Sequence, residues 1–270
     1  MAQHKLFAVL VTLHLLADLF VALLTDRRLS DARLGIVWSI FFAQVILAGV
    51  WLALGSGKFV VRVALSMSLV SIASAAQVIA LVRDDAPRHF IPVTISAAVI
   101  QYSIVAGLLL PIRIAGGWQF GHEQSRNKPQ RSDLQFGLAQ LLILTACAAI
   151  ALGVMRNAFR NIDLEQTGIS AGVYGLLIVS NVFIGLPTMR AAMAEQFMLF
   201  WLLACLVFSI GVTLVEVTVF ERAIAPPRSP DTFFWCLNTL EFCWIAFSLL
   251  VLRVDGFRLL RVKPGESEPL

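Results

Sequence analysis

Four side chains inside long apolar runs are the candidates for chemistry in this sequence. His14 and Asp18 are four positions apart in the first run, and Asn238 and Glu241 are three apart in the last. These spacings place each pair on one face of a helix. An imidazole beside a carboxylate can relay a proton or bind a polar substrate, and it can equally fix helix packing. Glu241 can likewise serve a proton- or ion-coupled role or pair with an amide on another helix.

Ionisable groups at such positions are costly in a membrane. An Asp, Lys or Arg at the centre of a span costs about 2.5–3.5 kcal/mol on insertion scales, so it faces the bundle interior or a water-filled cavity. Glu216 lies near the end of its run, and we expect it to extend toward the surface beside Glu221 and Arg222. Five carboxamides predict either one polar path or cross-links between helices: Gln44, Gln77, Gln101, Asn181 and Asn238.

Other familiar chemical motifs are missing from the sequence. The remaining histidines, His4, His89 and His122, lie in tails or loops, and no pair of ligands has the spacing of a metal site. There is no nucleophile elbow, Walker loop or dinucleotide fingerprint. The four cysteines fall inside apolar runs, where a free thiol packs as a small hydrophobe. We therefore assign no catalytic residue, no metal and no cofactor.

The composition defines the elements that must position these residues. Of the 270 residues 59% are hydrophobic and 14% charged, with a mean hydropathy of +0.83, whereas a soluble domain has about 25% charged residues. A helix of about 20 apolar residues crosses a bilayer. Because the runs are continuously apolar rather than alternating, they favour helices over a barrel. The sequence thus predicts an all-α, polytopic transmembrane helical bundle with eight spans, at 6–25, 34–54, 63–82, 90–112, 136–155, 170–189, 197–220 and 233–252.

The sixth predicted span, 170–189, is the least regular. It contains several glycines together with Asn181 and Pro187, so it can be kinked, or re-entrant if neighbouring protein shields its backbone. A re-entrant segment would leave seven spans and place the two termini on opposite sides of the membrane.

A polar linker at 121–135 divides the predicted spans into two blocks. The first block covers 1–120, and the second covers 136–270 with a short basic tail. The blocks end alike, because LPIRIAGGW at 110–118 and VLRVDGF at 251–257 each place an Arg, an aliphatic residue and a Gly after an apolar helix end. The likeness favours a tandem repeat, which four spans per block make parallel. Alternatively, it is a feature shared by any two helix ends that carry Arg.

Charge gives the expected orientation and partners. The net charge is +4, and the excess of Lys and Arg in alternate loops favours a bacterial inner-membrane protein with both termini in the cytoplasm. A basic balance in such a protein indicates contact with anionic lipid rather than nucleic acid. We expect the lipid bilayer as partner, together with other membrane proteins or a second copy of the chain.

Two short stretches of the sequence carry distinctive patterns. The first, at 135–156, follows a basic linker and carries Phe136, Gly137, Leu138, Gln140, Leu141 and Leu142. The second is a terminal Arg-x-x-Gly-aromatic-Arg-Leu, present as Arg253, Gly256, Phe257, Arg258 and Leu259. Both stretches resemble a family of uncharacterised multi-pass membrane proteins of planctomycete bacteria, and the resemblance implies a membrane protein and no activity, cofactor or site.

These features leave three hypotheses for function. The favoured one is a small-molecule or ion transporter of the permease type, with His14, Asp18 and Glu241 along the path. The alternatives are a membrane-embedded enzyme that uses the same residues and a non-catalytic scaffold or partner-binding subunit. Convergence of His14, Asp18 and Glu241 on one cavity would favour the first two, and their dispersal would favour the third.

Overall fold

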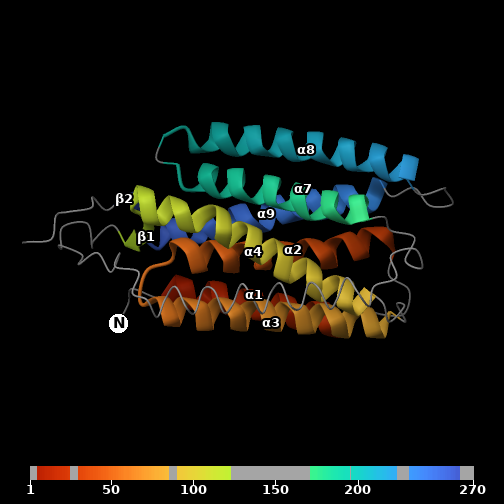
Figure 1. Cartoon of the computed structure of the whole chain (residues 1–270), viewed down its shortest axis with the longest axis horizontal. Coiled ribbons are helices and arrows are strands. Elements are labelled where there is room, and N and C mark those ends of the chain that lie inside the picture. Colours follow the sequence, from red (N-terminus) through yellow and green to blue (C-terminus); the bar gives the residue numbers. More distant parts are fainter. Residues whose placement is uncertain are drawn as a thin grey trace, which may run out of the picture.

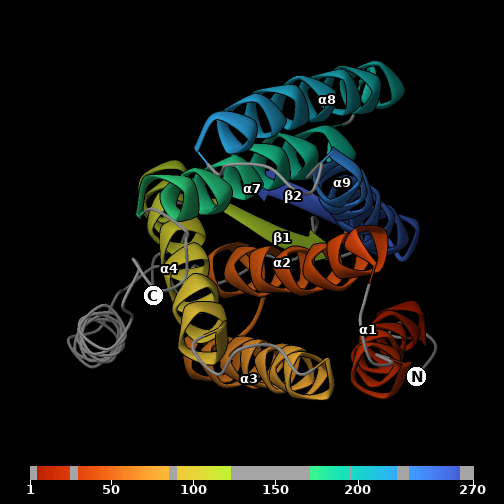
Figure 2. The same cartoon turned by 90° about the vertical axis from the view of Figure 1, so that its right-hand side faces the viewer.

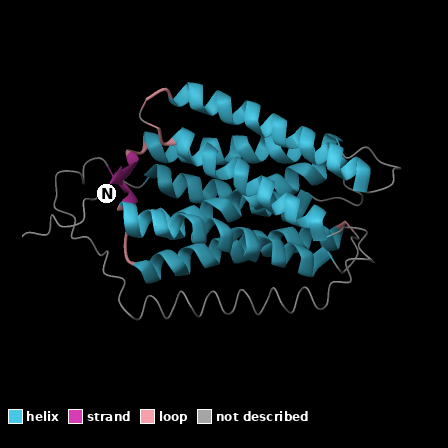
Figure 3. Cartoon of the chain, turned by 45° about the horizontal axis from the view of Figure 1, so that its top comes forward, coloured by secondary structure: helices cyan, strands magenta, loops and turns pink. Residues whose placement is uncertain are grey.

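The computed structural model describes residues 5–24, 30–84, 90–122, 171–194, 196–223 and 231–261. In this part of the chain, seven helices run side by side, and a two-stranded ribbon lies at one end of the bundle (Figure 1, Figure 3). In chain order the elements are α1 (Lys5–Leu24), α2 (Asp31–Leu54), α3 (Phe59–Arg83), α4 (Phe90–Gly116), β1 (Trp118–His122), α7 (Ala171–Ala192), α8 (Met198–Ala223), α9 (Asp231–Val254) and β2 (Phe257–Arg261).

The prediction of an all-α membrane bundle is confirmed. Six described helices are long and apolar enough to cross a membrane, and α1 contributes a shorter apolar stretch, Ala8–Leu23. Seven of the eight predicted spans coincide with these helices to within a few residues at each end. The fifth predicted span, 136–155, and the linker beyond residue 122 lie outside the described residues.

The sixth predicted span is a single helix, α7. It continues from Ala171 to Ala192 with Pro187 inside it, and its apolar part from Gly175 to Ala192 is long enough to cross a membrane. The re-entrant alternative is therefore wrong for this segment.

Helix α2 is the centre of the bundle. Seen along the bundle, it is surrounded by α1, α3, α4, α7 and α9, while α8 lies on the outside beyond α7 (Figure 2). In the most apolar window of α2, 83% of the residues are buried, against 11% in α8. Because both helices are strongly apolar, this contrast separates the protein core from a surface suited to lipid. The side chains of Phe42, Val45 and Ile46 are 0% exposed.

Glycines allow other helices to approach α2 closely. A Cβ added to Gly35 of α2 would lie 2.5 Å from the Phe233 carbonyl oxygen of α9, and one added to Gly185 of α7 would lie 2.5 Å from Ile46 Cδ1. Small residues give helices in lipid this close contact, which replaces the hydrophobic driving force available in water.

Arginines connect the C-terminal end of α2 to its neighbours. Arg62 of α3 donates to the Leu52 carbonyl at 2.7 Å, and Arg113 of α4 donates to the Gly55 carbonyl at 2.7 Å and to the Ala53 carbonyl at 3.1 Å. The last carbonyls of a helix have no partner within the helix, and they carry partial negative charge. The two guanidinium groups therefore stabilise the end of α2 through other helices.

The same arrangement occurs at two other helix ends. Arg83 of α3 donates to the Ala22 carbonyl of α1 at 2.8 Å. Arg253 of α9 donates to the Ala192 carbonyl of α7 at 3.1 Å and also to Ala194. Arg113 and Arg253, the arginines of the two similar sequence motifs, thus make equivalent contacts with a neighbouring helix end.

The ribbon was not predicted. Strands β1 and β2 pair antiparallel, with Trp118 opposite Arg261 and His122 opposite Phe257. Before each strand stands a glycine with positive φ, Gly117 at 66° and Gly256 at 90°, a conformation that favours glycine. Sequence analysis placed these residues at the start of the linker and in the basic tail. The strands were missed because five residues give too short a polar–apolar alternation to be recognised beside long helices.

We predict that Gly35→Ala destabilises the protein by about 1–3 kcal/mol, because the new methyl group collides with the backbone of α9. The measurement is the free energy of unfolding in detergent. Gly211→Ala in α8 is the matched control, since nothing lies within 4 Å of a Cβ there, and alanine favours a helix by up to about 1 kcal/mol. Equal effects of the two substitutions would contradict the close packing of α2 against α9.

We also predict that Arg113→Met lowers the free energy of unfolding by about 1.5–3 kcal/mol, the contribution of hydrogen bonds from a charged donor. Methionine keeps the apolar stem but removes both bonds to the end of α2. Arg33→Met, at an exposed position of α2, serves as the control. No difference between the two variants in the same assay would show that Arg113 does not stabilise this helix end.

Candidate functional site

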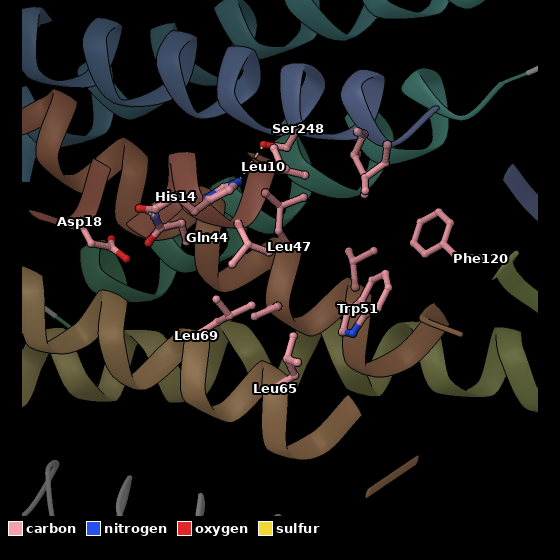
Figure 4. Close-up of a pocket in the computed structure, with 15 residues that line it drawn as sticks. Leu10, His14, Asp18, Gln44, Leu47, Trp51, Leu65, Leu69, Phe120 and Ser248 are labelled. Atoms are coloured by element: carbon pink, nitrogen blue, oxygen red, sulfur yellow. Dashed lines mark hydrogen bonds between the residues drawn. The ribbon is translucent and has the colours of Figure 1, made fainter. Parts of the chain in front are cut away.

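A pocket lies beside α1, between α1, α2, α3 and α9, with β1 at one end (Figure 4). We call it the α1 pocket. Its volume is about 80 Å³, room for several water molecules or a small organic molecule. The lining is apolar over most of its length, and Leu65, 38% exposed, places its mouth on the outer surface of the bundle between helices. The apolar lining includes Leu10, Val11, Leu47, Trp51, Leu69 and Phe120.

The polar end of the α1 pocket consists of His14 and Asp18 from α1, Gln44 from α2 and Ser248 from α9 (Figure 4). The Trp244 indole N–H donates to His14 Nδ1 at 3.2 Å, so the neutral ring carries its proton on Nε2. That nitrogen lies 3.1 Å from Ser248 Oγ, and the Ser248 hydroxyl donates to the Trp244 carbonyl at 2.8 Å. Both ring nitrogens of His14 are therefore engaged with α9.

Asp18 does not pair with His14, the residue that the spacing suggested, since both ring nitrogens of His14 are engaged with α9. The Gln44 side chain lines the pocket with Asp18 (Figure 4), and Gln44 Nε2 donates to the His14 carbonyl at 3.3 Å. Gln44 Oε1 is buried and has no partner among the described residues. The polar end therefore presents a carboxyl group and an unused amide oxygen, both hydrogen-bond acceptors, to anything that enters the pocket.

A second buried polar group lies between α7, α8 and α9. Asn238 Nδ2 donates to Thr213 Oγ1 at 3.0 Å and to Glu216, and the Ser180 hydroxyl donates to the other oxygen of Glu216. Glu241, one turn further along α9, is 0% exposed. We call these residues, Ser180, Thr213, Glu216, Asn238 and Glu241, the Glu216 cluster.

The expectation that Glu216 extends toward the surface is wrong. Its side chain is 1% exposed, because Ser180 of α7 and Asn238 of α9 offer it donors inside the bundle. An extended Glu216 side chain that reached water would lose conformational entropy. It has no need to reach water, because buried donors satisfy both of its carboxyl oxygens. The sequence alone gives the depth of Glu216 along its helix but not these two partners.

The predicted site residues fall into two places. His14 and Asp18 share the α1 pocket, and Asn238 and Glu241 share the Glu216 cluster; Glu241 does not line the pocket. Sequence analysis missed Trp244 and Ser248, whose spacing of four on α9 is the signal that they share a face. Among the described residues, no three His, Cys, Asp or Glu side chains are grouped to hold a metal ion.

Comparison with known proteins adds no relative. No protein family model, no curated protein and no solved structure matches the chain. The resemblance to planctomycete membrane proteins stays a prediction.

We predict that His14 and Trp244 are coupled energetically. In a double-mutant cycle of His14→Phe and Trp244→Phe, the coupling free energy of unfolding should be about 0.5–3 kcal/mol, because either substitution alone leaves a polar group of the other residue without its partner. A parallel cycle with Trp235→Phe is the control, since Trp235 is a partly exposed tryptophan of the same helix. Zero coupling for Trp244 would refute the hydrogen bond.

Proposed function

We propose that the protein is a small-molecule transporter of the permease type, and that its substrate binds in the α1 pocket. Glu241 lies outside this pocket, and that dispersal counts toward the scaffold hypothesis; the proposal rests on the cavity that His14 and Asp18 share. The observation that carries the proposal is the polar end of this pocket, which is near the middle of α1 and α2 and is continuous with an apolar chamber. A few polar groups at one end of an apolar cavity are the usual design of a small-molecule site. Polar groups at this depth are typical of substrate paths in membrane proteins.

The chemistry of the polar end indicates the class of substrate. Among the described residues that line the pocket, Asp18 is the only acidic one, and none is Lys or Arg. Gln44 Oε1 lacks a donor among the described residues. A molecule with an ammonium or other donor group on an apolar body would satisfy both acceptors and fill the chamber, whereas a carboxylate would meet Asp18 with like charge.

The distribution of basic residues supports the expected orientation in a bacterial inner membrane. The end of the bundle with the ribbon carries eight of the described basic residues, while Arg33, Arg83 and Arg222 belong to the opposite end (Figure 1). We propose that the ribbon end faces the cytoplasm, in line with the positive-inside rule. The start of α1 and the end of α9 are both at this end (Figure 1). The eight residues are Lys5, Lys58, Arg62, Arg113, Arg190, Arg253, Arg258 and Arg261.

The test uses hexylammonium and hexanoate, two probes with the same chain length and opposite charge. We predict that hexylammonium alters tryptophan emission saturably, since Trp51 lines the pocket, and that it generates a current in proteoliposomes on a solid-supported membrane. Hexanoate should do neither. Gln44→Leu removes the unused acceptor and should weaken hexylammonium binding by about tenfold or more.

Gln101→Leu is the matched control, because Gln101 is also a buried glutamine near the middle of a span but does not line the pocket. This variant should bind hexylammonium like the unmodified protein. Equal binding of the two probes, or equal effects of the two leucine variants, would refute the assignment of the pocket. Saturable binding without any current would refute transport and would indicate that the protein binds the molecule without moving it across the membrane.

A further inference from the structure

We propose that Glu216, Asn238 and Glu241 bind a monovalent metal cation, with Na⁺ as the representative ion, between α8 and α9. The site is separate from the α1 pocket, since Glu241 lies two turns before Ser248 on α9 and does not line the pocket. The inference therefore does not rest on the proposed function.

The first observation is a set of buried oxygens without partners. Asn238 Oδ1 and both carboxyl oxygens of Glu241 have no hydrogen-bond partner among the described residues, and both side chains are 0% exposed. The orientation of the Asn238 amide is fixed, because its nitrogen donates to Thr213 and Glu216. The atom left over is thus an oxygen, and the unsatisfied atoms of Asn238 and Glu241 are acceptors only.

The second observation is charge. Asn238 and Glu241 are one turn apart on α9, and Asn238 binds Glu216, so the two buried glutamates both neighbour one amide. Within the described part of the chain, no Lys, Arg or His side chain forms a hydrogen bond with either carboxyl group. Two buried acids without a positive partner are strongly unfavourable. A bound cation would relieve the repulsion.

The unused oxygens indicate which kind of ion fits. Carboxylate and amide oxygens suit hard cations. Ca²⁺ takes six to eight oxygen ligands, and Mg²⁺ retains several waters, which is more than two carboxyl groups and one amide in a closed interior supply. A monovalent cation needs one negative charge for balance. Glu216 can then be neutral and donate its proton to Ser180 Oγ, whose own hydrogen has the Leu177 carbonyl as acceptor at 2.9 Å.

A comparison within the chain shows that packing alone does not require these charges. Arg113 of α4 and Arg253 of α9 cap equivalent helix ends and lie 140 positions apart. When the two helices are aligned on these arginines, Gln101 corresponds to Glu241, because the same 140 positions separate them. The spacing of 139 positions between the first residues of α3 and α8 also separates Gln77 from Glu216. Gln77 and Gln101 are 1% and 0% exposed. Neutral side chains of the same size therefore occupy the corresponding positions, and the second set differs by its two carboxyl groups.

The experiment is equilibrium binding of radioactive ²²Na⁺ to the purified full-length protein in detergent, with choline as the replacement cation. Saturable binding is expected for the unmodified protein. Glu241→Gln should weaken binding by about tenfold or more, because the charged ligand is lost. Glu216→Gln should weaken it less, because Glu216 is neutral when the ion is bound and glutamine keeps its contacts with Ser180 and Asn238. Glu221→Gln is the control, an exposed glutamate of the same helix as Glu216, and it should bind normally.

Folding of each variant is checked by size-exclusion chromatography and by helical content. If Glu241→Gln does not fold, the binding curve of the unmodified protein and the response of its stability to Na⁺ decide the outcome. Absence of saturable Na⁺ binding to the unmodified protein would overturn the proposal, and so would stability that responds to pH but not to Na⁺, since the site would then hold protons only. Equal affinity of Glu241→Gln and Glu221→Gln would also overturn it.

Discussion

The interior of a bundle in lipid offers no water, so each buried polar group needs a partner from the protein itself. This constraint organises the structure. Arginines from neighbouring helices donate to the last carbonyls of α1, α2 and α7, and they join helices that would otherwise meet only through apolar contacts. His14 obeys the same rule, because Trp244 and Ser248 of α9 engage both of its ring nitrogens. These polar contacts fix which helix lies beside which, while the close packing of glycines supplies the contact area.

Two sets of buried atoms without a partner are informative because of where they lie. Gln44 Oε1 lies at the polar end of a pocket, where an entering molecule can serve as its donor. Asn238 Oδ1 and the carboxyl group of Glu241 lie in a closed interior beside a second glutamate, where a small cation can serve. The two places differ in shape and in charge, which is why we assign a donor-bearing organic molecule to one and a metal ion to the other.

The sequence predicts the helices well and the sites only in part. Continuous apolar runs determine the positions of the spans, because length and hydropathy decide what can cross a bilayer. Helical spacing also places His14 with Asp18, and Asn238 with Glu241, on common faces. It does not reveal that Trp244 and Ser248 face His14, or that Ser180 retains Glu216 in the interior, because those contacts join helices far apart in the sequence. The ribbon was not predicted for another reason. Its two five-residue strands lie far apart in the sequence, and they pair only because α4 and α9 bring them together.

The most direct test of this account is a high-resolution experimental map of the protein in lipid nanodiscs with Na⁺ present. We expect ordered density that belongs to no side chain beside Asn238 Oδ1 and Glu241, and density for water or a small molecule beside Gln44 Oε1, with none beside the satisfied ring of His14. A map in which other protein groups donate hydrogen bonds to these three side chains would contradict the account, because no unsatisfied oxygens would remain to bind a ligand.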